Sequence, residues 1–341
     1  MRDFSQWMAD HQAEWRKGHV VTSEHGLHGE KSHAWILPAA AWEEGLWPGL
    51  RAGQPDSIAA YLKSVGASRH SESHNLKSSW VACANLYFPF RLDVKDRAML
   101  AAFLARKANA EIRTVDRVEL EYAEDGALHP GELLGEQGGS RGAGQTSPDI
   151  AFLVNGGNGI VLTESKLTES SFATCSARTE EEKPDRPPNP DISRCLDAVK
   201  VALNPDAQCH QVVWGRKYWE RLGGAIDVAA LSSLKACPAA LGGYQLFRQQ
   251  ALAEGYTQKY DLVVSAVAYD ERNEALVRCL KRTGIDAFPQ GWGELFKGRA
   301  SFAAWTHQAW VEWVREHHAG RWTDWLEWIG ERYGYRRPVV A

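Results

Sequence analysis

The sequence has no apolar run that approaches the length of a membrane span, and its first 19 residues lack the apolar core of a signal peptide. We therefore expect a cytoplasmic protein with no membrane partner. Its six cysteines form no C-x-x-C pair, and its histidines form no H-E-x-x-H pattern. These absences argue against a secreted disulfide scaffold and against a compact zinc site.

Positive charge is also scarce, because 39 lysine and arginine residues face 43 aspartate and glutamate residues, for a net charge of −4. Any contact with nucleic acid must therefore use a local basic surface. What the chain does contain is 44% hydrophobic residues over 341 positions, enough for a substantial core. We expect a helical region at 1–70, a central core at 71–270 and a helical, tryptophan-rich region at 271–341 packed on that core.

Hydrophobic periodicity predicts an α/β fold. Helical spacing of apolar residues or a helix-like composition marks the segments 4–15, 72–88, 93–110, 193–203, 208–222 and 238–254. Alternating or continuous β-branched runs mark strands at 117–125, 149–154, 159–167 and 260–269. The motifs WVEWVRE and WLEWIGE predict two amphipathic helices near the C-terminus. The central elements thus follow the order α-β-β-β-α-β, in a mixed sheet flanked by helices.

The stretch 147–169, SPDIAFLVNGGNGIVLTESKLTE, reads as a β-hairpin because two apolar runs flank the turn sequence NGGNG. Glu164 and Lys166 are two residues apart and must emerge on one face of their strand. Asp149 begins the partner strand, so antiparallel pairing brings its carboxylate beside that of Glu164. We therefore expect Asp149, Glu164 and Lys166 to form one site.

Two carboxylates about 4 Å apart repel by roughly 4 kcal/mol at an effective dielectric of 20, so a cation is needed between them. Mg²⁺ suits this role because it accepts a few carboxylates and keeps positions for water and a phosphate oxygen, and Mn²⁺ is expected to substitute for it. A neighbouring lysine can orient water and stabilise charge on a phosphate. The chemistry implied is metal-assisted phosphodiester hydrolysis.

A plainer interpretation is that Glu164 and Lys166 form an exposed cross-strand charge pattern and that Asp149 is a turn residue. Pro-Asp occurs five times in the chain, and an acid two before a lysine occurs three times. Only Asp149, Glu164 and Lys166 share one predicted hairpin with buried-looking strands, where an unpaired charge is expensive. We therefore favour the catalytic interpretation.

Two segments carry candidate nucleic-acid contacts. The glycine-rich loop 126–146 contains Arg141 and leads directly to Asp149, although it could also be a plain solvent loop. The predicted helix 208–222 interleaves Arg216 and Lys217 with aromatic residues, which suits a DNA-facing helix, although such a mixture is more often merely an amphipathic helix with a cationic edge.

The residues around the hairpin resemble the PD-(D/E)XK nuclease superfamily, and more narrowly its restriction-endonuclease-like members. The resemblance rests on Arg141-Gly142-Ala143, Thr146-Ser147, Asp149 and the run ESKLTE from Glu164 to Glu169, together with the upstream segment HNLKSSWVACANLYFPF. It covers roughly residues 37–269. It implies a restriction-endonuclease-like core and metal-dependent cleavage of nucleic acid.

The resemblance also implies auxiliary residues. In the strand 117–125, one of the alternating acids could face the metal, and the Glu-Tyr pair favours Glu121, although both acids could equally face solvent. The first core helix of related nucleases can lend a carboxylate, which makes Glu72 a candidate. The later core helix often carries Gln-Leu, here Gln245-Leu246, so Gln245 could approach the site, although it could also simply cap the core. The main-chain carbonyl of Ser165 could complete the metal coordination.

These observations predict a Mg²⁺-dependent endonuclease of a restriction or defence type that cleaves DNA. If it cuts both strands, we expect it to act as a homodimer. The alternatives are a nucleic-acid-binding or assembly module that cuts nothing, and a structure-specific RNA nuclease. We do not expect an iron–sulfur cluster or zinc at Cys175, Cys195, Cys209 and Cys237, because their spacings match no compact ligand pattern.

Overall fold

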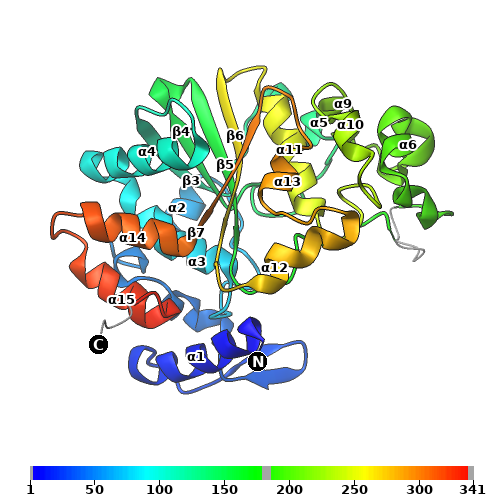
Figure 1. The fold of residues 1–341 in the computed structure, drawn as a ribbon. Coiled ribbons are helices and arrows are strands. Elements are labelled where there is room, and N and C mark those ends of the chain that lie inside the picture. The colour runs from blue at the N-terminus through cyan, green and yellow to red at the C-terminus, as the bar shows by residue number, and fades with distance from the viewer. Residues whose placement is uncertain (1–2, 179–185, 337–341) are drawn as a thin grey trace.

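A computed structural model describes residues 3–178 and 186–336 and has a mixed α/β architecture (Figure 1). Its main sheet has five strands in the order β3-β4-β5-β6-β7. The first three pair antiparallel, and β5, β6 and β7 pair in parallel. The strands are β3 Val115–Leu120, β4 Ile150–Val154, β5 Gly159–Lys166, β6 Leu262–Tyr269 and β7 Ser301–Thr306.

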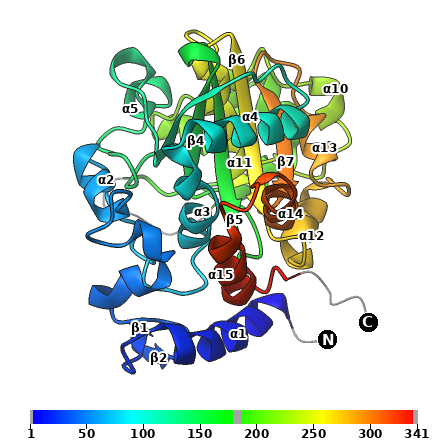
Figure 2. The same ribbon diagram turned by 90° about the vertical axis from the view of Figure 1, so that its left-hand side faces the viewer.

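Helices cover both faces of this sheet (Figures 1 and 2). One face packs against α3 Ser79–Tyr87, α4 Val94–Ala108 and α14 His307–His317, and the other packs against α11 Tyr244–Tyr256. Each face has its own hydrophobic cluster, and alternate strand residues point into one or the other. The sheet is thus buried on both sides, as the continuous apolar runs predict.

The remaining elements surround this core. A small hairpin pairs β1 Gly26–His28 with β2 Lys31–His33. The other helices are α1 Phe4–His19, α2 Ile58–Ser64, α5 Pro130–Leu133, α6 Ala198–Leu203, α7 Pro205–Gln208, α8 His210–Val213, α9 Tyr218–Leu222, α10 Val228–Leu231, α12 Glu274–Arg278, α13 Gln290–Gly293 and α15 Thr323–Tyr333. In the described ranges, no helix combines the length and the apolar character needed to cross a membrane.

The predicted hairpin of β4 and β5 is confirmed. Ile150 pairs with Thr163 and Val154 with Gly159. The connecting residues Asn155, Gly156 and Gly157 all have positive φ, which explains why asparagine and glycine occupy the turn.

Four predicted helices are shorter than expected or interrupted. The helix expected over 193–203 is a 3₁₀ turn, Ile192–Leu196, followed by the short α6. The helix expected over 72–88 begins only at Ser79, because Ser78 caps it by accepting a hydrogen bond from Val81 N. The helix expected over 238–254 begins at Tyr244, directly after two glycines. The helix expected over 208–222 is interrupted between α8 and α9, where Gly215 has φ of 75° and ends the helical path.

Strand β7 was not expected, and it joins the sheet from beyond residue 270. The two C-terminal helices, in contrast, are present as α14 and α15 and pack as core. Trp310 and Trp325 are fully buried, and their indole N–H groups donate to the main-chain oxygens of Leu86 and Asn85 on α3. The tryptophan motifs therefore anchor the C-terminal helices to the core.

Candidate active site

The register of the hairpin brings Asp149 and Glu164 to the same place. Because Ile150 pairs with Thr163, the preceding Asp149 lies opposite Glu164 at the end of β4. The main-chain N–H of Ser165 donates to Asp149 Oδ2 at 2.7 Å. Ala151 and Leu162, which share the alternation of these acids, belong to the cluster on the α11 side. The two carboxylates therefore face α11 together.

Lys166 joins the two acids on this face. Its Nζ lies 2.7 Å from Glu164 Oε1, and the two side chains are only 5% and 11% exposed. Gln245, from α11, donates to the same oxygen at 3.0 Å. Burial alone would lower the pKa of Lys166, but the nearby carboxylates of Glu164, Glu169 and Asp149 raise it above its usual value. Lys166 is therefore an ammonium ion at neutral pH.

Glu121 is the third carboxylate and is 4% exposed, so its strand does not turn it toward solvent. It follows the end of β3 with φ of 51°, a left-handed conformation that is uncommon outside glycine, and its N–H donates to Asp149 O at 3.3 Å. Burial raises the pKa of Glu121 well above its usual range, and the charges of Asp149 and Glu164 raise it further. Burial and Glu164 raise the pKa of Asp149 in the same way.

A cation bound between the carboxylates would lower these raised pKa values, because it favours the charged forms. The available ligands are oxygens, which Mg²⁺ prefers. Among the described residues, however, no group of three histidine, cysteine, aspartate or glutamate side chains is arranged to hold a metal ion. A metal would therefore rely on two carboxylates completed by main-chain carbonyl and water oxygens, as is common for Mg²⁺.

The carboxylates line a cavity of about 230 Å³. Its wall consists of His70, Glu121, Gly142, Ala143, Gly144, Gln145, Thr146, Ser147, Asp149, Glu164, Gln245, Arg248 and Gln249. Five of these thirteen residues, 142–146, form the end of the loop 126–146. Gly142 has φ of 77°, and a Cβ there would lie 2.6 Å from Ser68 O, so this position requires glycine.

The basic residues predicted for DNA contact are engaged with the protein itself. Arg141 donates to the main-chain oxygens of Glu121 and Leu120, each at 2.9 Å, and thus ties the loop to the end of β3. Arg216 bonds the carbonyl of Gly135, and Lys217 bonds the carbonyl of Glu132 at 3.2 Å. The roles of these three residues in DNA binding stay predictions.

Glu72 does not line the cavity. It lies in a turn before α3, and its carboxylate approaches the ring of His28 at 3.6 Å. The expectation that it acts as an auxiliary ligand depended on the helix beginning at residue 72, and that helix begins at Ser79.

Four polar residues of the cavity wall were not identified from the sequence: His70, Gln145, Arg248 and Gln249. Arg248 follows Gln245 by three positions on α11, so helical spacing placed it on the same face and could have identified it. His70 stacks on Trp80 with ring centroids 6.5 Å apart, and burial lowers its pKa. The sequence contains no local signal that brings His70 or Gln145 to the carboxylates.

Cys175, Cys195, Cys209 and Cys237, considered above for a metal centre, are free thiols on segments that lie near one another in space. Cys237 N donates to Cys195 O at 2.8 Å, and burial together with the thiols of Cys209, Cys175 and Cys195 raises the pKa of Cys237. Within the part of the chain that the structure describes, no three of them form a group that could hold a metal ion. Elemental analysis of the purified protein tests whether they bind one.

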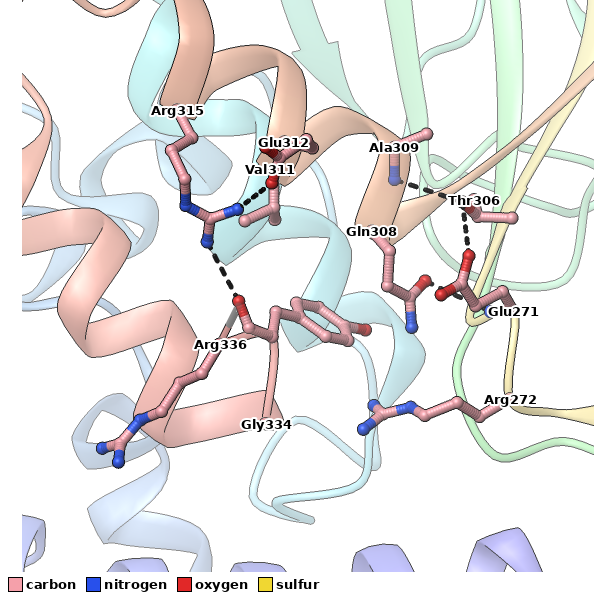
Figure 3. Close-up of a pocket in the computed structure, with 11 residues that line it drawn as sticks. Glu271, Arg272, Thr306, Gln308, Ala309, Val311, Glu312, Arg315, Gly334 and Arg336 are labelled. Carbon is pink, nitrogen blue, oxygen red and sulfur yellow. Dashed lines mark hydrogen bonds and ion pairs between the residues drawn. The ribbon is translucent and has the colours of Figure 1, made fainter. Parts of the chain in front are cut away.

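A second cavity, of about 430 Å³, lies beside α14 and the end of α15 (Figure 3). Its arginines are neutralised by the protein. Arg272 pairs with Asp270 at 2.6 Å, and Arg336 pairs with Glu331 of α15. Arg315 bonds Glu312 and the main-chain carbonyl of Tyr335. We assign this cavity no catalytic role, because the acid–lysine site lies elsewhere.

A buried hydrogen-bond chain fixes the backbone at Lys166. Trp305 Nε1 donates to Tyr87 Oη at 3.0 Å, and Tyr87 Oη lies 3.1 Å from His307 Nδ1. His307 Nε2 lies 3.2 Å from the main-chain oxygen of Lys166. A carbonyl can only accept, so His307 carries its proton on Nε2 and accepts from Tyr87 on Nδ1. Burial lowers the pKa of His307 to about 4, so the ring is neutral at physiological pH.

His307→Gln is expected to reduce the loss of unfolding free energy that occurs as pH falls below neutral. The unfolded histidine takes up a proton near its pKa of 6.5 while the folded one resists until about pH 4, so the wild type loses roughly 3 kcal/mol of unfolding free energy as pH falls across that window. Urea unfolding from pH 7 to 4 measures this loss. His317→Gln, at an exposed position of α14, is the control. Equal slopes for wild type and His307→Gln would contradict the assignment.

Comparison with known families agrees with this geometry. A family model described as Restriction Endonuclease associating with ARP matches residues 8–334, which is nearly the whole chain and includes every residue of the cavity that Asp149 and Glu164 line. No curated protein and no solved structure matches. Membership of a restriction-endonuclease family indicates a nuclease and implies nucleic-acid binding. The sheet with its carboxylate-bearing hairpin and the match over 8–334 together show that the chain belongs to the family of restriction endonucleases associating with ARP.

Proposed function

We propose that this chain is a Mg²⁺-dependent endodeoxyribonuclease with a PD-(D/E)XK active site on the α-β-β-β-α-β core. The observation that carries the proposal is the convergence of Asp149, Glu164 and Lys166: both carboxylates line one cavity, and the Lys166 ammonium contacts Glu164 at 2.7 Å. Opposed carboxylates next to a buried ammonium are the groups that metal-assisted phosphodiester hydrolysis requires.

Asp149 and Glu164 would hold the metal ion, with the main-chain carbonyl of Ser165 as a further ligand and Glu121 as an assisting carboxylate. When bound, Mg²⁺ supplies Lewis-acid stabilisation of the phosphate and lowers the pKa of bound water. One oxygen of each main ligand is already held in place: Ser165 N–H binds Asp149 Oδ2, and Gln245 binds Glu164 Oε1. These contacts leave the other oxygen of each carboxylate available to a metal ion.

Lys166 contributes a fixed positive charge. Since its pKa is raised, it is a poor general base and acts instead by donating hydrogen bonds to an attacking water or to a phosphate oxygen as negative charge develops. His307 holds the main chain of Lys166, and Glu169 accepts from Leu167 N at 2.8 Å just beyond it. Both contacts hold the peptide group between Lys166 and Leu167, and so fix the backbone from which the ammonium projects.

Incubation of the purified protein with supercoiled plasmid, single-stranded DNA and RNA tests the proposal. We expect DNA cleavage with Mg²⁺ or Mn²⁺ and none with a chelator. Linear product without a nicked intermediate indicates coordinated cutting by two active sites, as in a homodimer. Binding without cleavage under every metal condition favours the non-catalytic module, and cleavage of RNA alone favours the RNA nuclease.

The family description also names an association with ARP. We propose the same association for this chain, and co-purification of the two proteins tests it.

A further inference from the structure

Arg248 is a cation of the cavity wall that the roles above leave unused. It projects from α11 beside Gln245, and its side chain is 24% exposed. Its Nε donates to Thr146 Oγ1 at 2.9 Å and lies 3.3 Å from Glu136 Oε1. In the described chain, the terminal nitrogens Nη1 and Nη2 make no hydrogen bond. The guanidinium is therefore held through Nε, while the other donors of this cavity-lining residue are free to bind a ligand.

The surroundings of Arg248 keep it charged and in place. Burial alone would lower its pKa, but Glu136, the hydroxyls of Tyr218 and Tyr244, and Glu164 raise that pKa above its usual value. Its Cζ lies over the ring of Tyr244, 5.3 Å from the ring centroid, in a cation–π contact. Glu136 is itself fixed, because it accepts from Tyr218 Oη at 2.7 Å. The orientation of the fork is thus set before any substrate arrives.

Gln145 supplies a second, independent sign of a missing ligand. It lines the same cavity and is 7% exposed. Neither Oε1 nor Nε2 of its amide has a hydrogen-bond partner among the described residues. Buried amides are normally paired, because leaving both ends unsatisfied is costly. Gln145, with no hydrogen-bond partner, and Arg248, with only Nε engaged, line the same cavity. Together they indicate a binding site for a polar group of a ligand.

We propose that Arg248 binds the non-bridging oxygens of the substrate phosphodiester through Nη1 and Nη2, and that Gln145 donates its amide N–H to the same nucleotide. The proposal rests on the proposed nuclease function and names the groups that bind its substrate. A polyanion approaching three carboxylates needs a fixed cation, and the planar guanidinium fork matches two phosphate oxygens. Arg141, whose donors hold main-chain oxygens, does not offer this fork.

Substitution of Arg248 tests the proposal in two assays. Arg248→Met should lower single-turnover cleavage by about 10²-fold, and Arg248→Lys should recover only part of this loss, because it keeps the charge without the fork. Binding of a 30-base-pair duplex in chelator, followed by anisotropy against salt, should weaken about tenfold, with a salt slope smaller by about 1. Arg278→Met, on the surface of α12, is the control.

Two further variants separate substrate binding from folding. Arg248→Met leaves Glu136 buried without its cation, so Arg248→Met/Glu136→Gln restores neutrality while keeping an acceptor for Thr146. Gln145→Leu removes the unsatisfied amide and should raise the melting temperature while weakening duplex binding. A structural role for these residues does not predict that combination.

The outcomes distinguish this proposal from the nuclease assignment. If the wild type binds duplex but cuts nothing with any metal, and Arg248→Met loses that binding, the nuclease assignment fails and the phosphate site stands. If the wild type cleaves and the double variant matches Arg278→Met in both cleavage and binding, the phosphate site is refuted and Arg248 only pairs with Glu136.

Discussion

The substitution Asp149→Asn is expected to reduce Mg²⁺-dependent cleavage by about 10³-fold or more, and at the same time to stabilise the metal-free protein. Cleavage falls because an amide is a poor ligand for a hard cation and carries no charge to hold it. Stability rises because Asp149 is buried against Glu164 and Glu121, so its charge is unfavourable when no cation is present. Initial cleavage rates and urea unfolding in chelator measure the two effects.

The stability gain of Asp149→Asn depends on pH in a defined direction. The folded-state pKa of Asp149 is raised above its ordinary value of 3.8, so the folded protein holds this proton more tightly than the unfolded chain does. The stabilisation that Asp149 provides when protonated is complete below that ordinary value and is lost as pH rises through the folded-state pKa. The advantage of the asparagine variant should therefore be largest at neutral pH and disappear on acidification.

Asp206→Asn is a matched control, because Asp206 also follows a proline but lies exposed in α7. It should change neither cleavage nor the stability difference between pH 5 and 8. Added Mg²⁺ should stabilise the wild type and not Asp149→Asn. Undiminished cleavage by Asp149→Asn would refute the role of Asp149 as a metal ligand.

The hairpin could be predicted from the sequence because every signal that defines it is local. The turn residues, the two apolar runs and the two-residue alternation all lie within 147–169, and antiparallel pairing leaves one register that buries both strands. The opposition of Asp149 and Glu164 follows directly from that register. The burial of Glu121 was open in the sequence, since it depends on which neighbour β3 acquires.

The cavity wall opposite the hairpin was predictable only in part, because it is assembled from distant segments. Gln245 and Arg248 reach the site from α11, about 80 residues after β5 by their numbering, and Gln145 reaches it through a loop that folds back on itself between Ser140 and Ala143. Nothing within 147–169 specifies these approaches. The predicted helix over 208–222 failed for a local reason, since Gly215 adopts a left-handed conformation that apolar spacing does not reveal.

Removal of the ammonium by Lys166→Met is expected to lower cleavage by about 10²- to 10³-fold and to destabilise the fold by about 3 kcal/mol. The loss of stability follows because Glu164 would stay buried with only Gln245 as a partner. Lys95→Met is the control, since Lys95 also follows an acid by two positions but is exposed at the start of α4.

The double variant Lys166→Met/Glu164→Gln separates the two effects of this lysine. Removing both charges eliminates the unpaired buried carboxylate, so most of the unfolding free energy should return while cleavage stays at background. Because the pKa of Lys166 is raised, the wild-type rate should also show no loss between pH 7 and 10 from deprotonation of this residue. If Lys166→Met cut DNA within twofold of the wild type, the lysine would be a structural partner of Glu164, and the charge that stabilises the transition state would have to come from a side chain that lines the cavity.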